Sequence, residues 1–71
     1  MSRYLFVIEP TATGFSAFSP DLPGCGAAGD TREEVETLMR EAIEFHVDGL
    51  RREGEPVPKP TTFAGYAEVA G

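Results

Sequence analysis

The feature that most constrains this sequence is a single capped helical segment between residues 31 and 54. Thr31 is followed three positions later by Glu34, the T-x-x-E pattern in which each side chain bonds to a backbone N–H that a helix start leaves unpaired. Gly54 and Pro56 end the pattern, because glycine favours the C-terminal cap and proline cannot continue a helix. We therefore predict one helix of about 22 residues, roughly 33 Å long.

Apolar residues recur at three- and four-residue steps along this segment, so one face of the helix should pack against other structure. The stripe comprises Val35, Leu38, Met39, Ala42, Ile43, His46 and Leu50, and it is widened on its flanks by Phe45 and Val47. The single histidine lies in this stripe. We therefore interpret His46 as a structural residue rather than a catalytic one.

Four short segments predict strands: residues 4–8, 15–18, 25–29 and 61–69. The first is apolar at consecutive positions, so both of its faces need cover and it suits a central strand. Turns separate the first three, with Gly14 able to take positive φ in the first and a Leu22-Pro23-Gly24 turn before the third. The predicted fold is α+β in the order β-β-β-α-β. It is a four-stranded mixed sheet with one helix on one face, in a single domain over residues 1–71.

A domain of 71 residues buries only roughly 60% of the surface that its unfolded chain exposes, and such domains often need added support. One cysteine cannot form an internal disulfide, and no Cys or His cluster offers a metal site, so we expect neither cofactor nor metal. Leu5 and Val7 point to the face of the sheet that one helix would leave open. We therefore expect a homo-oligomer, either a dimer or a tetramer.

The chain is acidic, with 12 acids, 6 basic residues and a net charge of -6. Nine of the acids lie between Asp30 and Glu55. Direct DNA or RNA binding is not expected, because phosphate contacts draw on Lys and Arg clusters, whereas a basic protein partner is favoured. No run of about 18 apolar residues and no leader peptide is present, so we expect a cytoplasmic protein without membrane contact.

The stretch from Asp21 to Asp30, DLPGCGAAGD, resembles in composition a loop with a nucleophilic cysteine or a phosphate-binding loop, but its residues support neither. Cys25 lacks the neighbouring base that a nucleophile needs, and the glycines match no phosphate-binding motif. Glu9 and Asp21 both sit near predicted strand ends, where two carboxylates could approach each other and hold a metal ion. The residues alone therefore leave a metal-dependent nuclease as an alternative.

Several motifs taken together resemble the HicB antitoxin family. They are Y-x-F-x-I-E-P from Tyr4, F-S-P-D-L-P-G-C from Phe18, G-D-T-x-E-E from Gly29, and G-E-P-V-P-K-P ending at Pro60. The resemblance implies a partial RNase H-like fold whose first strand is central. It also implies a function without enzymatic activity: binding and neutralising HicA, a small basic toxin that cleaves RNA with a histidine.

Many members of that family carry a C-terminal DNA-binding domain that represses their own operon. This sequence ends at Gly71, so we expect a short member without that domain. The residues predicted to contact a partner chain are Asp21, Leu22, Pro23, Gly24, Phe45 and Val47. The alternatives are an orphan ligand- or protein-binding module, or a residual metal-dependent nuclease on a degraded RNase H-like scaffold.

Overall fold

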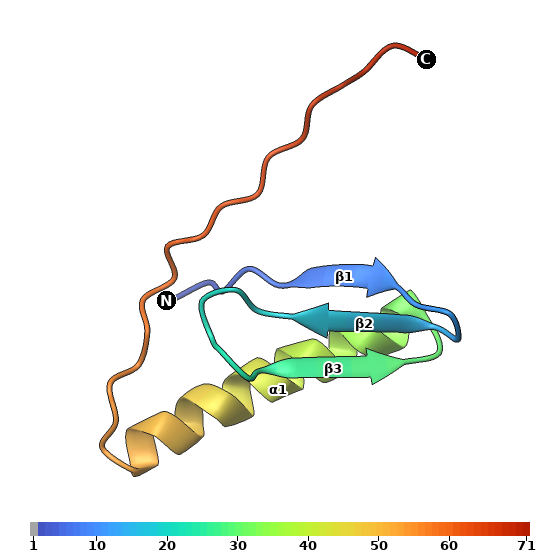
Figure 1. The fold of residues 1–71 in the computed structure, drawn as a ribbon. Helices are drawn as coiled ribbons and strands as arrows, with labels where there is room; N and C mark the ends of the chain where they lie inside the picture. Colours follow the sequence, from blue (N-terminus) through green and yellow to red (C-terminus); the bar gives the residue numbers. More distant parts are fainter. Residues whose placement is uncertain (1) are drawn as a thin grey trace.

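The computed structural model describes residues 2–71, which form three strands followed by one helix (Figure 1). The elements are β1 (Val7–Pro10), β2 (Phe15–Phe18), β3 (Gly26–Gly29) and α1 (Arg32–Arg52). Both strand pairs are antiparallel and the order across the sheet is β1-β2-β3, so β2 is the central strand.

The turn between β1 and β2 is closed by Thr11 and Gly14. The Thr11 N–H donates to the Gly14 carbonyl oxygen at 2.8 Å, and the Gly14 N–H donates to the Thr11 hydroxyl at 3.0 Å. Gly14 could take a positive φ but does not adopt one. Glycine is needed there for a different reason: a Cβ at this position would collide with the carbonyl oxygen of Gly29, at the end of β3.

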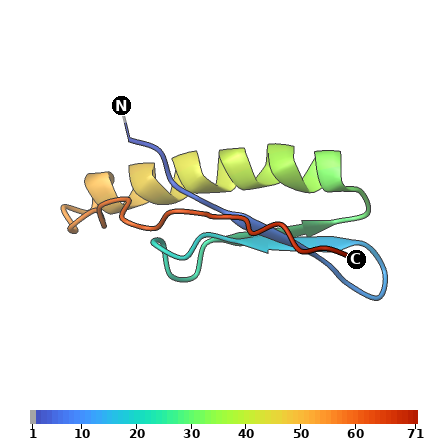
Figure 2. The same cartoon turned by 90° about the horizontal axis from the view of Figure 1, so that it is seen from above.

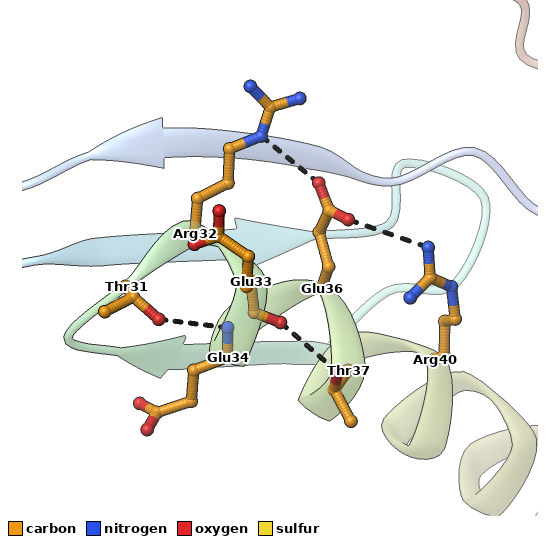
Figure 3. A network of polar contacts seen from close by, with 7 residues as sticks. All are labelled: Thr31, Arg32, Glu33, Glu34, Glu36, Thr37 and Arg40. Atoms are coloured by element: carbon orange, nitrogen blue, oxygen red, sulfur yellow. Dashed lines mark hydrogen bonds and ion pairs between the residues drawn. The ribbon is translucent and has the colours of Figure 1, made fainter.

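Both ends of α1 are capped as the sequence predicts. At the start, the Glu34 N–H donates to the Thr31 hydroxyl at 3.1 Å, as Figure 3 shows, and the Glu34 carboxylate accepts from the Asp30 N–H at 3.0 Å. At the end, the Gly54 N–H donates to the Arg51 carbonyl and the Glu55 N–H to the Leu50 carbonyl. This pair of bonds satisfies carbonyl groups that would otherwise lack partners.

The core lies between the sheet and α1, which covers one face of the sheet (Figure 2). Ile8, Ala17 and Ala27 are paired across the three strands and therefore point to the same face, toward the helix. The most deeply buried side chains are Leu22, Val35 and Met39. Within residues 2–71, no helix combines the length and apolar character that crossing a membrane requires.

The structure corrects two predictions about the sheet. It has three antiparallel strands rather than four in a mixed arrangement, because residues 61–69 pair with no strand of the described chain. The predicted central strand, β1, consequently lies at an edge. The physical reason is the connector between helix and tail, where Pro56, Pro58 and Pro60 fix φ and hold their neighbours extended. The chain therefore leaves the sheet instead of folding back beside β1 (Figure 1).

Candidate functional site

The loop between β2 and β3 holds the base of the C-terminal tail through one carboxylate. Both N–H groups of Thr61 and Thr62 donate to Oδ2 of Asp21 at 3.0 Å. Their hydroxyls donate to Oδ1 at 3.2 and 2.8 Å. These bonds, led by the one from the Thr62 N–H, lower the pKa of Asp21 below its ordinary value. The Asp21 carboxylate is thus engaged within its own chain.

The remainder of this loop divides between core and surface. Leu22 is fully buried, and Cys25 is buried with its N–H bonded to the Leu22 carbonyl at 3.1 Å. Gly24 has φ of 83°, as the predicted turn requires, and it is exposed together with Pro23. Burial raises the pKa of the Cys25 thiol, the opposite of what a nucleophile needs. The loop therefore leaves Pro23 and Gly24 at the molecular surface.

The two predicted contact residues on α1 face in different directions. Phe45 is 74% exposed, whereas Val47 is buried in the core. Two positions along a helix turn a side chain by about 200°, which accounts for the difference. Leu38, two turns before Phe45, is also exposed, and Ala42 lies between them in the same row. These three residues form an apolar row beside the core face, which we call the Leu38–Phe45 row.

The charges of α1 are also divided between two sides. Glu36 forms ion pairs with Arg32 at 3.1 Å and with Arg40 at 3.6 Å (Figure 3). The acidic face is a second group, with no ion pair among the described residues: Glu33, Glu41, Glu44 and Asp48. All four are exposed, and their spacing places them along one side of the helix. Glu41 and Asp48 lie one turn before and one turn after Phe45, so an exposed aromatic ring is flanked by carboxylates.

The structure does not bring Glu9 and Asp21 together, as the nuclease alternative would require. Glu9 pairs with Ser16 near the β1–β2 turn, whereas Asp21 follows the opposite end of β2. Among residues 2–71, no group of three His, Cys, Asp or Glu side chains could hold a metal ion. His46 is half-buried in the helical stripe, on the core side where the sequence places it.

Sequence reasoning missed the anchoring of the tail. Besides the Asp21 bonds, the Tyr4 hydroxyl donates to the Pro58 carbonyl at 2.6 Å. These contacts join residues 40 to 54 positions apart. Because no periodic pattern links such positions, the signal is only the chemistry of Asp21 and the adjacent threonines, which are natural hydrogen-bond partners.

Comparisons with known proteins agree with one another. Residues 4–70 match a family model described as "HicB_like antitoxin of bacterial toxin-antitoxin system". The chain is 32% identical over 60 residues to "Antitoxin HicB 2" of Photorhabdus laumondii, covering 84% of this chain and 43% of that protein. It is 38% identical over 63 residues to a 14.9 kDa protein of Haemophilus phage HP1, covering 89% and 47%.

The chain therefore spans about half the length of these curated relatives. Among solved structures, it is similar to a chain of a structure described as the "HicA3 and HicB3 toxin-antitoxin complex". The TM-score is 0.69 and the identity is 36%, over 82% of this chain and 66% of that one.

Proposed function

We propose that this chain, which belongs to the HicB-like antitoxin family of bacterial toxin-antitoxin systems, binds a small basic toxin and blocks its cleavage of RNA. The likeness to a chain from a HicA3–HicB3 complex supports a toxin of the HicA kind. In this proposal the chain acts by covering the toxin's active surface and performs no catalysis itself. It acts in the cytoplasm, where the RNA targets of such a toxin are found.

The observation that carries the proposal is the exposed ring of Phe45 beside the acidic face of α1. A toxin that binds RNA must present a basic surface, and four unpaired carboxylates in a row offer that surface the charge of its usual ligand. Charge complementarity mainly speeds encounter, whereas affinity comes from a few apolar anchors that become fully desolvated. Phe45 and its row supply such an anchor among the charges.

The proposal narrows the predicted contact residues. Pro23, Gly24 and Phe45 are exposed and remain in it. Leu22 and Val47 are excluded as direct contacts, because their side chains are buried in the core of their own chain. Asp21 contributes by fixing the loop and the tail rather than by offering a free carboxylate.

We also propose that the protein self-associates. β1 is an uncovered edge, and Leu5 and Val7 are only half-buried. The face of the sheet opposite α1 carries Phe18, which is exposed in line with Val7. A second copy would bury part of this apolar surface, which is worth roughly 25 cal/mol per Å2 and matters in a domain of this size.

The test is inhibition of the RNA cleavage carried out by a small basic toxin of the HicA kind. We expect cleavage to stop at saturating concentrations of the antitoxin. Phe45→Ser should weaken the complex by about 30-fold or more, the size of an interface hot spot. Glu44→Lys should slow association, with a stronger effect at low salt, because exposed charges act over roughly 10 Å at 0.1 M salt. Glu9→Lys makes the same charge change away from α1 and is the matched control.

Two outcomes would redirect the assignment. RNA cleavage that continues at saturation would reject neutralisation and favour the orphan binding module. Cleavage of RNA by this chain itself, lost on Glu9→Ala, would favour the residual nuclease.

A further inference from the structure

The C-terminal tail, residues 61–70, carries large apolar side chains that contact almost nothing. Phe63, Tyr66 and Val69 are 92%, 100% and 87% exposed. Hydrogen bonds anchor the tail only at its base, through Thr61 and Thr62, and no bond among the described residues involves 63–71. Single exposed apolar residues are ordinary, but three along one extended segment indicate a surface that is buried in an assembly.

The sheet has an edge suited to receive such a segment. The outer side of β1 has no neighbouring strand, and α1 packs mainly over β3 and β2 and reaches β1 least. Tyr4, Phe6 and Ile8, which point toward the core, are therefore only half-buried. An open edge presents unpaired N–H and C=O groups that template pairing with another strand.

A groove separates this edge from the tail of the same chain. Two adjoining hollows of about 540 and 720 Å3 share Leu5, Phe6 and Ala64 as lining residues, so they form one continuous opening. Tyr66 lines the first hollow and Phe63 the second. Figure 1 shows the tail diverging from β1, and hollows of this size are absent from packed interiors, so the tail is not docked on its own sheet edge.

The connector explains why the tail does not close this groove itself. Residues 55, 57 and 59 each precede a proline and are confined to extended conformations, so the connector cannot bend back sharply. The Asp21 bonds fix its far end. A tail that is extended, apolar and held away from its own sheet edge is the arrangement that favours exchange between identical chains.

We propose that residues 61–70 of one copy enter the groove of a second copy and pair with the edge of its β1, while the second copy's tail does the same in return. This inference rests on the proposed self-association and specifies its mode. The exchanged tail would supply the fourth strand that each sheet lacks. Because side chains alternate along a strand, Phe63 and Val69 would point to one face of the sheet and Tyr66 to the other.

Charge permits this assembly although each chain carries a net charge of -6. Glu68 is the only charged residue between Thr61 and Gly71. Three charged residues line the groove: Arg32 and Glu36 are paired with each other, and Arg3 adds a positive charge. The acidic face of α1 does not line the groove and stays available to a basic toxin.

The first experiment measures mass by sedimentation equilibrium. We expect twice the chain mass of 7.6 kDa for the unaltered protein. Phe63→Ser combined with Tyr66→Ser should yield monomers, with dimerisation weakened about 100-fold or more, because each aromatic ring can bury 150–250 Å2. The variant should keep its helical circular dichroism, since neither ring contributes to the core. Phe45→Ser, which removes another exposed aromatic, is the matched control and should remain dimeric.

The second experiment determines whether the tail joins the sheet of its own copy or the sheet of the other copy. In a dimer mixed from 13C-labelled and unlabelled copies, isotope-filtered NOEs should connect the Tyr66 ring of one copy to Leu5 or Val7 of the other. A monomeric unaltered protein at millimolar concentration, or a dimer unaffected by the double substitution, would overturn the proposal. So would tail-to-β1 NOEs seen only within one copy. Failure of toxin inhibition with these results intact would reject the proposed function alone.

Discussion

Large apolar side chains are buried in the body of the molecule, residues 2–55, but exposed in its C-terminal tail. In the body, Leu22, Val35 and Met39 are fully buried; in the tail, Phe63 and Tyr66 are almost fully exposed. The difference lies in the connections. Tight turns return each strand of the body onto its neighbour, whereas a proline-rich connector directs the tail away. An apolar residue is therefore buried only where the chain can bring a surface to it.

The largest expected effect on stability comes from truncating one apolar side chain in each region and comparing the two losses. Leu22→Ala should lower the free energy of unfolding by about 2–5 kcal/mol, because it removes buried contacts and leaves a cavity. Phe63→Ala, measured at concentrations where the protein is monomeric, should change it by less than about 0.5 kcal/mol. Urea titration followed by circular dichroism measures both. An equal loss in the two variants would show that the tail packs on the body.

A second comparison uses glycines. Gly14→Ala should destabilise the fold by about 1–3 kcal/mol, because the new Cβ meets the backbone of Gly29 and the hairpin must shift. Gly65→Ala is the control in the tail: a Cβ there meets nothing within 4 Å, so stability should stay within about 0.5 kcal/mol. Thermal unfolding measures the stability of both variants. Equal stability of the two would contradict the close approach of Gly14 to the backbone of Gly29.

The smallest effect concerns the link between the regions. Because hydrogen bonds hold the pKa of Asp21 below its ordinary value of 3.8, the anchoring is fully present above that value. It should be lost as the pH falls through the lowered pKa, when the carboxylate is protonated. The amide shifts of Thr61 and Thr62 should then move toward unfolded values while those of α1 persist. In Asp21→Ala these shifts should already be displaced at pH 7, and an unchanged tail there would contradict the anchoring role.

Elements governed by local chemistry were predictable from the sequence. The helix was predicted at about its observed length because Thr31, Glu34 and Gly54 specify its ends through short-range hydrogen bonds. The first hairpin and the Pro23-Gly24 turn follow from the same kind of local rule. The fourth strand was not predictable, because strand propensity in residues 61–69 cannot indicate whether a pairing edge lies in the same chain.

Which of the predicted contact residues are exposed could be foreseen only in part, for a related reason. Phe45 was identified as widening the apolar stripe, and the structure places it in solvent among carboxylates. Val47 satisfied the same pattern but lies in the core. A periodic stripe marks which side of a helix is apolar, yet the edge between buried and exposed depends on how the helix sits over the sheet. Here α1 is displaced toward β3, and that displacement is set by tertiary packing.

The stiff connector has a consequence for how the chain can evolve. Prolines fix φ at about −65° and hold a chain in or near the polyproline II conformation, which rises about 3.1 Å per residue. The number of residues in EPVPKP therefore sets how far beyond α1 the N–H groups of Thr61 and Thr62 lie, and the Asp21 carboxylate must meet them at that distance. Inserting one residue would move the threonines by about 3 Å, which is enough to break their hydrogen bonds to Asp21. The length of the connector should therefore be kept, although its composition can vary wherever the extended conformation is kept.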